Sequence, residues 1–222
     1  MEPIIEIPDP KNARAFEIVR TAVSRLRQNR PFVIGITGAG GAGKTTFGNN
    51  ISLYYGRDNC VSIDLDDYLL SREERGKLEV TGYNPQANKL FLAKENIEYL
   101  VTGKTISKPR YDHSTGKVLS DEQITPKSII VIEGVTTLYP ELRDLSDISF
   151  FLDALEETQI QSRIERDVKT RGYTREQALI LFKTVQPDYL RFIEPTKESA
   201  SVIFQVGIDY IMRPIHILEK LK

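Results

Sequence analysis

The chain of 222 residues is long enough for one α/β domain with a full hydrophobic core, and it is short for two such domains. Hydrophobic residues make up 40% of the sequence and charged residues 27%, which is typical of a globular protein and carries no signature of disorder. The formal net charge of −1 excludes a global basic field that would hold nucleic acid or an anionic membrane, although it is compatible with a local cationic pocket for phosphates.

Cysteine and histidine are scarce in this sequence. Cys60 is the only cysteine, so no disulfide can form within the chain and a reducing compartment is expected. Together with His113 and His216, it supplies too few ligands for a zinc site within one chain. No apolar run approaches the roughly 20 residues of a membrane helix, and the first residues lack the hydrophobic core of a signal peptide. We therefore expect a soluble cytoplasmic protein that acts on a small molecule, with neither nucleic acid nor membrane as partner.

An amphipathic helix is predicted near the N-terminus. Asp9 is a suitable N-cap and Pro10 is suited to the first helical position. Apolar residues then recur at helical spacing and predict a helix over residues 10–29: Phe16, Val19, Val23 and Leu26. We expect residues 1–30 to form a helical extension that packs or makes an oligomer contact, and residues 31–222 to form the main domain. Whether the chain self-associates stays open.

Strands and helices alternate along the rest of the chain. Buried apolar runs predict strands at 32–36, 61–65, 128–132, 148–152 and 202–206. Apolar residues at helical spacing predict a helix around Phe47, Ile51 and Tyr54 and another at 155–170. A further helix is predicted at 87–102, with Gly103 just past its end. A capping box at Thr174 and Gln177 predicts a last helix that runs to about Val185. Residues 104–125 have no helical period and predict two short strands or a long functional loop. The alternation predicts an α/β fold whose mainly parallel sheet is covered by helices on both faces.

A phosphate-binding loop is the strongest motif. Residues 38–45 read Gly-Ala-Gly-Gly-Ala-Gly-Lys-Thr and satisfy G-x-x-x-x-G-K-[ST]. Glycines let backbone N–H groups approach phosphate oxygens, and the following helix adds its positive N-terminal end. Lys44 is placed to reach the β- and γ-phosphates, and Thr45 offers a hydroxyl to Mg²⁺. The predicted nucleotide-binding set is Gly38, Ala39, Gly40, Gly41, Ala42, Gly43, Lys44, Thr45 and Thr46.

A GTPase shares such a loop but also needs a guanine-reading motif. Guanine readers normally carry N-K-x-D, and the nearest string here is Asn88-Lys89-Leu90-Phe91, which lacks the aspartate. It also falls early in a predicted helix, where a guanine-reading segment would not lie. The sequence therefore disfavours a GTPase.

Carboxylates follow two predicted strands. Asp64-Leu65-Asp66-Asp67-Tyr68 ends the second strand, and ligands of open parallel sheets lie beyond the carboxyl ends of strands. An aspartate there could take the proton of an attacking hydroxyl, although a solvated acidic turn or a helix cap is the alternative. Glu133 follows the strand at 128–132 and could hold the Mg²⁺ water shell or simply cap the next segment.

Two basic segments could stabilise transferred charge. Arg163 and Arg166 lie one turn apart on the helix at 155–170, which Arg171 closes. They could form a lid that stabilises phosphoryl oxygens and excludes water, or they could lie on a solvated helix face. The non-helical segment Lys108-Pro109-Arg110-Tyr111-Asp112-His113 could line an acceptor pocket, particularly for a phosphorylated acceptor.

Taken together, these motifs resemble the phosphoribulokinase/uridine kinase family of P-loop kinases over about residues 32–207. The resemblance rests on GITGAGGAGKTT, DLDDY, KPRYDHSTG, IIVIEG, LRDLSDISFFLD, RIERDVKTRG and TVQPDYLRFIEPTKESASVI. It implies a three-layer P-loop NTPase fold with a small helical lid at about 160–185 and an acceptor-binding insertion at about 84–125. It further implies an ATP-dependent kinase that uses Mg²⁺ and phosphorylates a hydroxyl group.

The resemblance also implies roles for particular residues. Asp66 matches the catalytic base of the family, with Lys44 and Arg166 as further catalytic residues. Thr45 and Glu133 match the metal-associated positions. Three arginines match lid residues around the ATP phosphates: Arg163, Arg166 and Arg171. The expected acceptor-binding set is Asp66, Tyr68, Lys108, Arg110, Tyr111 and His113.

The acceptor stays open between two subfamilies. The segment 142–203 is similar to uridine kinases, whereas 83–88 and 108–116 are similar to phosphoribulokinases. Asn84 stands where uridine kinases usually carry the histidine of D-H-P, and Leu69 replaces a polar or aromatic residue usual in both subfamilies. We lean to a sugar-phosphate acceptor, because basic residues of the segment 108–113 could meet an extra phosphate. A uridine/cytidine kinase of pyrimidine salvage and a catalytically silent nucleotide-binding regulatory protein are the alternatives.

Overall fold

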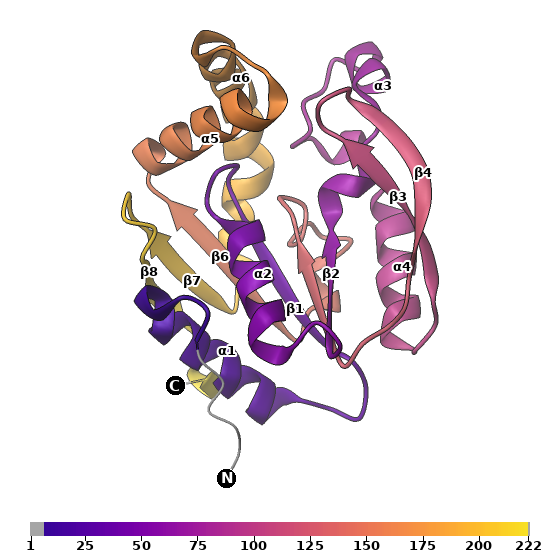
Figure 1. Ribbon diagram of the computed structural model, residues 1–222, viewed down its shortest axis with the longest axis vertical. Coiled ribbons are helices and arrows are strands. Elements are labelled where there is room, and N and C mark those ends of the chain that lie inside the picture. The colour runs from indigo at the N-terminus through magenta and orange to yellow at the C-terminus, as the bar shows by residue number, and fades with distance from the viewer. Residues whose placement is uncertain (1–6, 222) are drawn as a thin grey trace.

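The structure is a computed structural model that describes residues 7–221, with the side chain of Arg171 left out of the description (Figure 1). A six-stranded sheet has the order β2-β5-β1-β6-β7-β8, and β3 and β4 form a separate hairpin. The strands are β1 (Phe32–Gly38), β2 (Cys60–Asp64), β3 (Ile106–Asp112), β4 (Lys117–Ile124), β5 (Ile129–Glu133), β6 (Ile148–Ala154), β7 (Val202–Val206) and β8 (Met212–Ile217). The helices are α1 (Ala13–Leu26), α2 (Lys44–Tyr55), α3 (Arg72–Lys77), α4 (Leu90–Val101), α5 (Glu156–Arg171) and α6 (Arg175–Asp188). Within this described range, no helix has both the length and the apolar character that crossing a membrane requires.

The predicted mainly parallel sheet is confirmed. Its strands pair in parallel except β8, which runs antiparallel to β7. All seven residues of the central strand β1 are buried, because helices cover both of its faces. Phe32, Ile34 and Ile36 pack with α1 and α2, while the alternate residue Val33 packs with α4 on the other side. Figure 1 shows α1 and α2 in front of the sheet.

The first helix differs from its prediction at both ends. A 3₁₀ turn at Pro10–Asn12 precedes α1, which ends at Leu26 before the predicted end at residue 29. Asp9 occupies the N-cap position and Pro10 opens the turn, as predicted, but the Asp9 carboxylate caps no backbone N–H and instead accepts a hydrogen bond of 2.8 Å from the side chain of Asn12. The helix is part of the main core, where the ring of Phe16 meets that of Phe47 edge-on at 5.9 Å. The domain boundary drawn at residue 30 stays a prediction.

The segment 104–125 forms two strands, which decides between the two predicted alternatives. β3 and β4 pair antiparallel with a register shift between Lys108 and Arg110. Two elements were not predicted. The short helix α3 has no buried residue and hence no apolar period. The edge strand β8 contains Pro214, a residue that disfavours a strand, and the register shift opposite Ile203 and Phe204 leaves Ile215 outside the pairing.

The end of α6 changes its winding. The predicted capping box of Thr174 and Gln177 is present, and the helix continues to Asp188 with Pro187 inside its last turn. Because proline removes a helical N–H and crowds the preceding turn, the chain then follows a π turn at Tyr189–Ile193. Asp188, the last residue of α6, accepts a hydrogen bond of 2.7 Å from the hydroxyl of Thr81.

Candidate active site

The glycine-rich loop joins the end of β1 to the start of α2 at the carboxyl end of the sheet. Gly41 has φ +88°, and a Cβ atom on it would lie 2.9 Å from the backbone oxygen of Gln159, so the loop requires glycine there. The ammonium of Lys44 folds back and donates to the carbonyl oxygens of Gly38 and Ala39, each at 3.0 Å. The loop is thus a structured cradle at a helix N-terminus, the arrangement that binds phosphate groups.

Glu133 and Thr45 meet beside this loop. Glu133 ends β5, the neighbour of β1, and it is only 4% exposed. Burial raises the pKa of Glu133, while the ammonium of Lys44 and a hydrogen bond with the Thr45 hydroxyl act in the opposite direction. A carboxylate and a hydroxyl are oxygen ligands that suit Mg²⁺, so the pair fits the ion. Among residues 7–221, no group of three or more histidine, cysteine or acidic side chains is arranged to hold a metal ion by itself.

The three aspartates at the end of β2 and in the turn that follows have different surroundings. Asp64 accepts a hydrogen bond of 2.8 Å from the N–H of Asp66 and so caps the 3₁₀ turn at Leu65–Tyr68. Burial, and then the charges of Asp66 and Glu133, raise the pKa of Asp64. Asp67 is bound by the ammonium of Lys108 and, at 2.8 Å, by the N–H of Tyr111.

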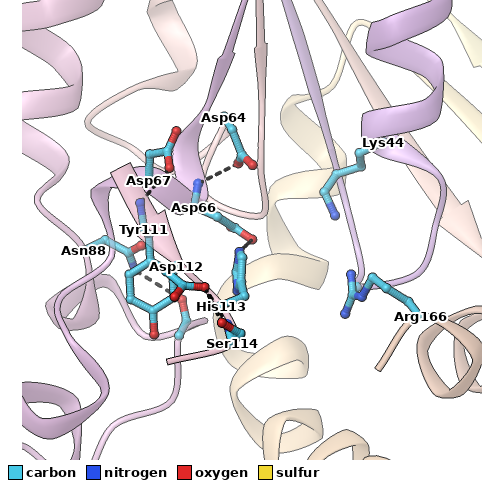
Figure 2. Close-up of polar contacts among 12 residues, drawn as sticks. Lys44, Asp64, Asp66, Asp67, Asn88, Tyr111, Asp112, His113, Ser114 and Arg166 are labelled. Carbon is cyan, nitrogen blue, oxygen red and sulfur yellow. Dashed lines mark hydrogen bonds and ion pairs between the residues drawn. The ribbon is translucent and has the colours of Figure 1, made fainter. Parts of the chain in front are cut away.

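Asp66 is the member of the group whose carboxylate is accessible, with 37% of its side chain exposed. Its Oδ2 lies 3.6 Å from Nε2 of His113, and Figure 2 shows the two side chains pointing toward one another. In the same view Lys44 and Arg166 extend from α2 and α5. Of the three aspartates, Asp66 therefore has the carboxylate that a ligand can reach most readily.

A cavity of about 330 Å³ joins these groups. It brings together many of the predicted site residues: Gly40, Lys44, Thr45, Asp66, Tyr111, His113, Glu133, Arg163 and Arg166. Residues from β2, α3, the β3–β4 hairpin and the α5–α6 pair thus share one space with the phosphate loop. Such a space can hold a polyphosphate and a second small molecule side by side.

The arginines of α5 line the cavity. Nε of Arg163 lies 3.6 Å from Oδ2 of Asp167, and its guanidinium lies 6.0 Å from the ring of Phe182 on α6. Nε of Arg166 donates to the other oxygen of Asp167 at 3.2 Å. Asp167 thus orients two cations toward the cavity. The prediction for the Arg171 side chain lies outside the described residues.

Part of the predicted acceptor set does not line the cavity. Tyr68 is 1% exposed, and its hydroxyl accepts a hydrogen bond from Asn96 in the core. Lys108 is also buried, since its ammonium is paired with Asp67. Arg110 lies past the register shift of β3, is exposed, and does not line the cavity. These three side chains thus lie apart from the cavity that contains Asp66, Tyr111 and His113.

Other cavity residues escaped the sequence analysis. Arg72 and Arg75 on α3 both line the cavity. Arg72 donates to the His113 carbonyl oxygen at 3.0 Å, and Arg75 donates to the Tyr111 hydroxyl at 2.6 Å. One sequence signal could have revealed α3, because Ser71 and Glu74 form its capping box. The remaining unpredicted lining includes Asp64, Leu69, Val80, Thr81, Gly82, Tyr83, Tyr173, Leu181, Thr184 and Val185.

Solved structures share this fold at low sequence identity. D-glycerate 3-kinase from Cryptococcus neoformans aligns with a TM-score of 0.65 at 15% identity, covering 94% of this chain and 98% of that one. Phosphoribulokinase from Rhodobacter spheroides aligns with a TM-score of 0.62 at 18% identity, covering 81% and 71%. At such identities these matches show the fold alone, which is that of P-loop kinases.

Sequence comparison goes further. A phosphoribulokinase from Synechocystis is 39% identical over 180 residues, which are 80% of this chain and 54% of that protein. A uridine kinase from Ligilactobacillus salivarius is 36% identical over 210 residues, covering 87% of this chain and 97% of that protein. The chain thus spans about half of this phosphoribulokinase and nearly all of this uridine kinase. The Phosphoribulokinase / Uridine kinase family itself matches residues 33–211, so the chain belongs to this family.

Proposed function

We propose that the chain is a cytoplasmic, ATP-dependent kinase that transfers the γ-phosphoryl group of Mg·ATP to a hydroxyl of a phosphorylated sugar. The observation that carries the proposal is the position of Asp66. Its half-exposed carboxylate lies in one cavity between the phosphate loop and a wall that contains Arg72 and Arg75. A buried free thiol at Cys60 suits the reducing cytoplasm, where ATP is available.

In the proposed reaction, Asp66 accepts the proton of the acceptor hydroxyl as its oxygen attacks the γ-phosphorus. The bond from the γ-phosphorus to the bridging oxygen breaks, and ADP leaves with the electron pair. Lys44 leaves its loop carbonyls to contact the phosphates, and Arg166 stabilises charge on the transferred group. Mg²⁺, held through Thr45 and Glu133, would neutralise charge on the β- and γ-phosphates.

The α5–α6 pair is proposed as the lid of this site. Tyr173, Leu181 and Val185 line the cavity together with the arginines of α5. Apolar side chains on this side would exclude water from the transferred phosphoryl group and so limit hydrolysis of ATP.

The acceptor class follows from charge on the wall opposite the lid. Arg72 and Arg75 line the cavity beside His113, and arginine guanidinium groups bind phosphate by paired hydrogen bonds. These two arginines replace Lys108 and Arg110 as the proposed contacts for a phosphate on the acceptor.

A nucleoside acceptor is the second candidate, and one observation favours it. Apolar side chains also line the cavity and could receive a base: Leu69, Val80, Leu181 and Val185. The match to nearly the full length of a uridine kinase agrees with this alternative.

The experiment is an ADP-release assay with ATP, Mg²⁺ and a panel of pentose phosphates, the matching unphosphorylated pentoses, and nucleosides. We expect turnover with a pentose phosphate, and an Arg75→Met variant should raise KM for that acceptor about tenfold or more while leaving KM for ATP unchanged. Arg14→Met, on the exposed surface of α1, is the matched control. Turnover with nucleosides alone would replace the sugar-phosphate proposal, and ATP binding without turnover on any acceptor would favour a silent nucleotide-binding protein.

A further inference from the structure

A tyrosine of the acceptor wall reaches the phosphate loop. The backbone N–H of Gly40 donates a hydrogen bond of 3.0 Å to the hydroxyl oxygen of Tyr83. A Cβ atom on Gly40 would lie only 2.6 Å from that oxygen, so the glycine leaves room for the hydroxyl. Tyr83 belongs to the loop between α3 and α4, far from the phosphate loop in sequence.

The main chain around Tyr83 is tied on several sides. Tyr139 donates a hydrogen bond to the carbonyl oxygen of Tyr83, and the N–H of Tyr83 donates to the hydroxyl of Thr81 at 3.1 Å. Asn88 donates to the carbonyl oxygen of Gly82 at 3.2 Å. These contacts fix the backbone, so the phenol has one defined place from which to reach the loop.

The Tyr83 hydroxyl can still give a hydrogen bond. It accepts from Gly40, and within residues 7–221 its own proton has no recorded acceptor. A hydroxyl that accepts a hydrogen bond from a phosphate-loop amide, and whose own O–H group is unused, is oriented to donate a hydrogen bond to a phosphate oxygen. Nη1 of Arg163 lies 3.6 Å from the point that a Cβ atom on Gly40 would occupy, so a guanidinium cation faces the same glycine as the Tyr83 hydroxyl.

We propose that the Tyr83 hydroxyl donates a hydrogen bond to the terminal phosphate of the bound nucleoside triphosphate. The terminal phosphate is favoured over the inner ones because Gly82, beside Tyr83, lies next to the acceptor wall: Nη1 of Arg75 is 3.3 Å from the place that a Cβ atom on Gly82 would occupy. Tyr83 is then a further phosphate-contacting residue, supplied by the acceptor wall instead of the loop. The inference rests on the proposed ATP-dependent transfer.

The test compares ATP with ADP in the Tyr83→Phe variant, which keeps the ring and removes the donor. By titration calorimetry with Mg²⁺ and no acceptor, Kd for ATP should rise about tenfold, as loss of a hydrogen bond to a charged group predicts, while Kd for ADP should stay within about twofold. Unchanged ADP binding also shows that the variant is folded. Tyr99→Phe removes an exposed hydroxyl that donates a hydrogen bond to Glu95, and it should change neither value.

Each other outcome overturns the assignment. An equal loss of affinity for ATP and ADP would place the contact on an inner phosphate or make it merely structural. Unchanged ATP affinity, in a wild-type protein that binds and turns over ATP, would overturn this inference and leave the proposed function intact. A wild-type protein that binds no ATP would overturn both.

Discussion

In the proposed nucleotide wall of the cavity, the phosphate loop contributes main chain from one contiguous stretch, whereas the proposed acceptor wall consists of side chains from segments far apart in sequence. Between Gly38 and Lys44, backbone angles and a helix N-terminus form the cradle. Opposite it, Arg72, Arg75 and His113 come from a short helix and a hairpin. On the proposed assignment, donor binding depends on a backbone shape that few substitutions can preserve, while acceptor choice can change with single side chains.

Asp66, at the junction of the two walls, gives the largest expected effect. Asp66→Asn should lower kcat about 10²–10⁴-fold, because the amide cannot take the proton of the acceptor hydroxyl. Kd for ATP should remain nearly the same, since the change adds no clash at the phosphate loop. Steady-state kinetics and calorimetry measure the two quantities. Asp121→Asn, on exposed β4, is the control, and an unaltered kcat in Asp66→Asn would remove Asp66 from the role of base.

Variants of the Asp67–Lys108 ion pair test whether the stability of the structure behind the acceptor wall depends on one buried contact. Lys108→Met should destabilise the protein by about 3 kcal/mol, because it leaves Asp67 without its cation. The double variant Asp67→Asn/Lys108→Met should recover part of that loss. Urea unfolding measures the free energies, and Lys77→Met, at a fully surface ion pair, should change stability by less than about 1 kcal/mol. If the losses of unfolding free energy in the two single variants, Asp67→Asn and Lys108→Met, add up to the loss in the double variant, the two side chains are not energetically coupled.

Gly41 tests the backbone character of the nucleotide wall. Gly41→Ala adds a Cβ atom 2.9 Å from the Gln159 backbone oxygen at a positive φ, so Kd for ATP should rise about tenfold. Gly43 also has a positive φ but an open Cβ position, so Gly43→Ala isolates the conformational cost. Equal effects of the two changes would show that the contact with Gln159 does not matter.

The smallest expected effect is a gain of stability at Asp64. Burial and neighbouring carboxylates raise the pKa of Asp64 in the folded state. Because folding then disfavours the charged carboxylate, the folded protein loses stability as the pH rises from the unfolded-state pKa of Asp64 through its raised folded-state pKa. Asp64→Asn should therefore raise Tm by about 2 °C at neutral pH in EDTA without nucleotide. The gain should vanish below about pH 3.9, where the unfolded carboxyl is also protonated. Asp144→Asn, at an exposed side chain, should show no such profile.

Local sequence was sufficient for features made by neighbouring residues. The loop at 38–45, the buried strands and the strand-end carboxylates Asp66 and Glu133 are all encoded within short stretches. The direction of Lys108 was not predictable, because it depends on a register shift in the hairpin and on Asp67 from a different segment. Likewise α3 is too short and too polar to show a period, although its cap at Ser71 was visible.

Pro214 in the edge strand β8 has a consequence for how copies of the chain can meet. A proline offers no N–H to an incoming strand, and the unpaired Ile215 beside it interrupts the repeat that such a strand would follow. This edge of the sheet is therefore a poor template for pairing with a β-strand of another chain. An assembly through this border would therefore depend more on side-chain contacts than on strand pairing.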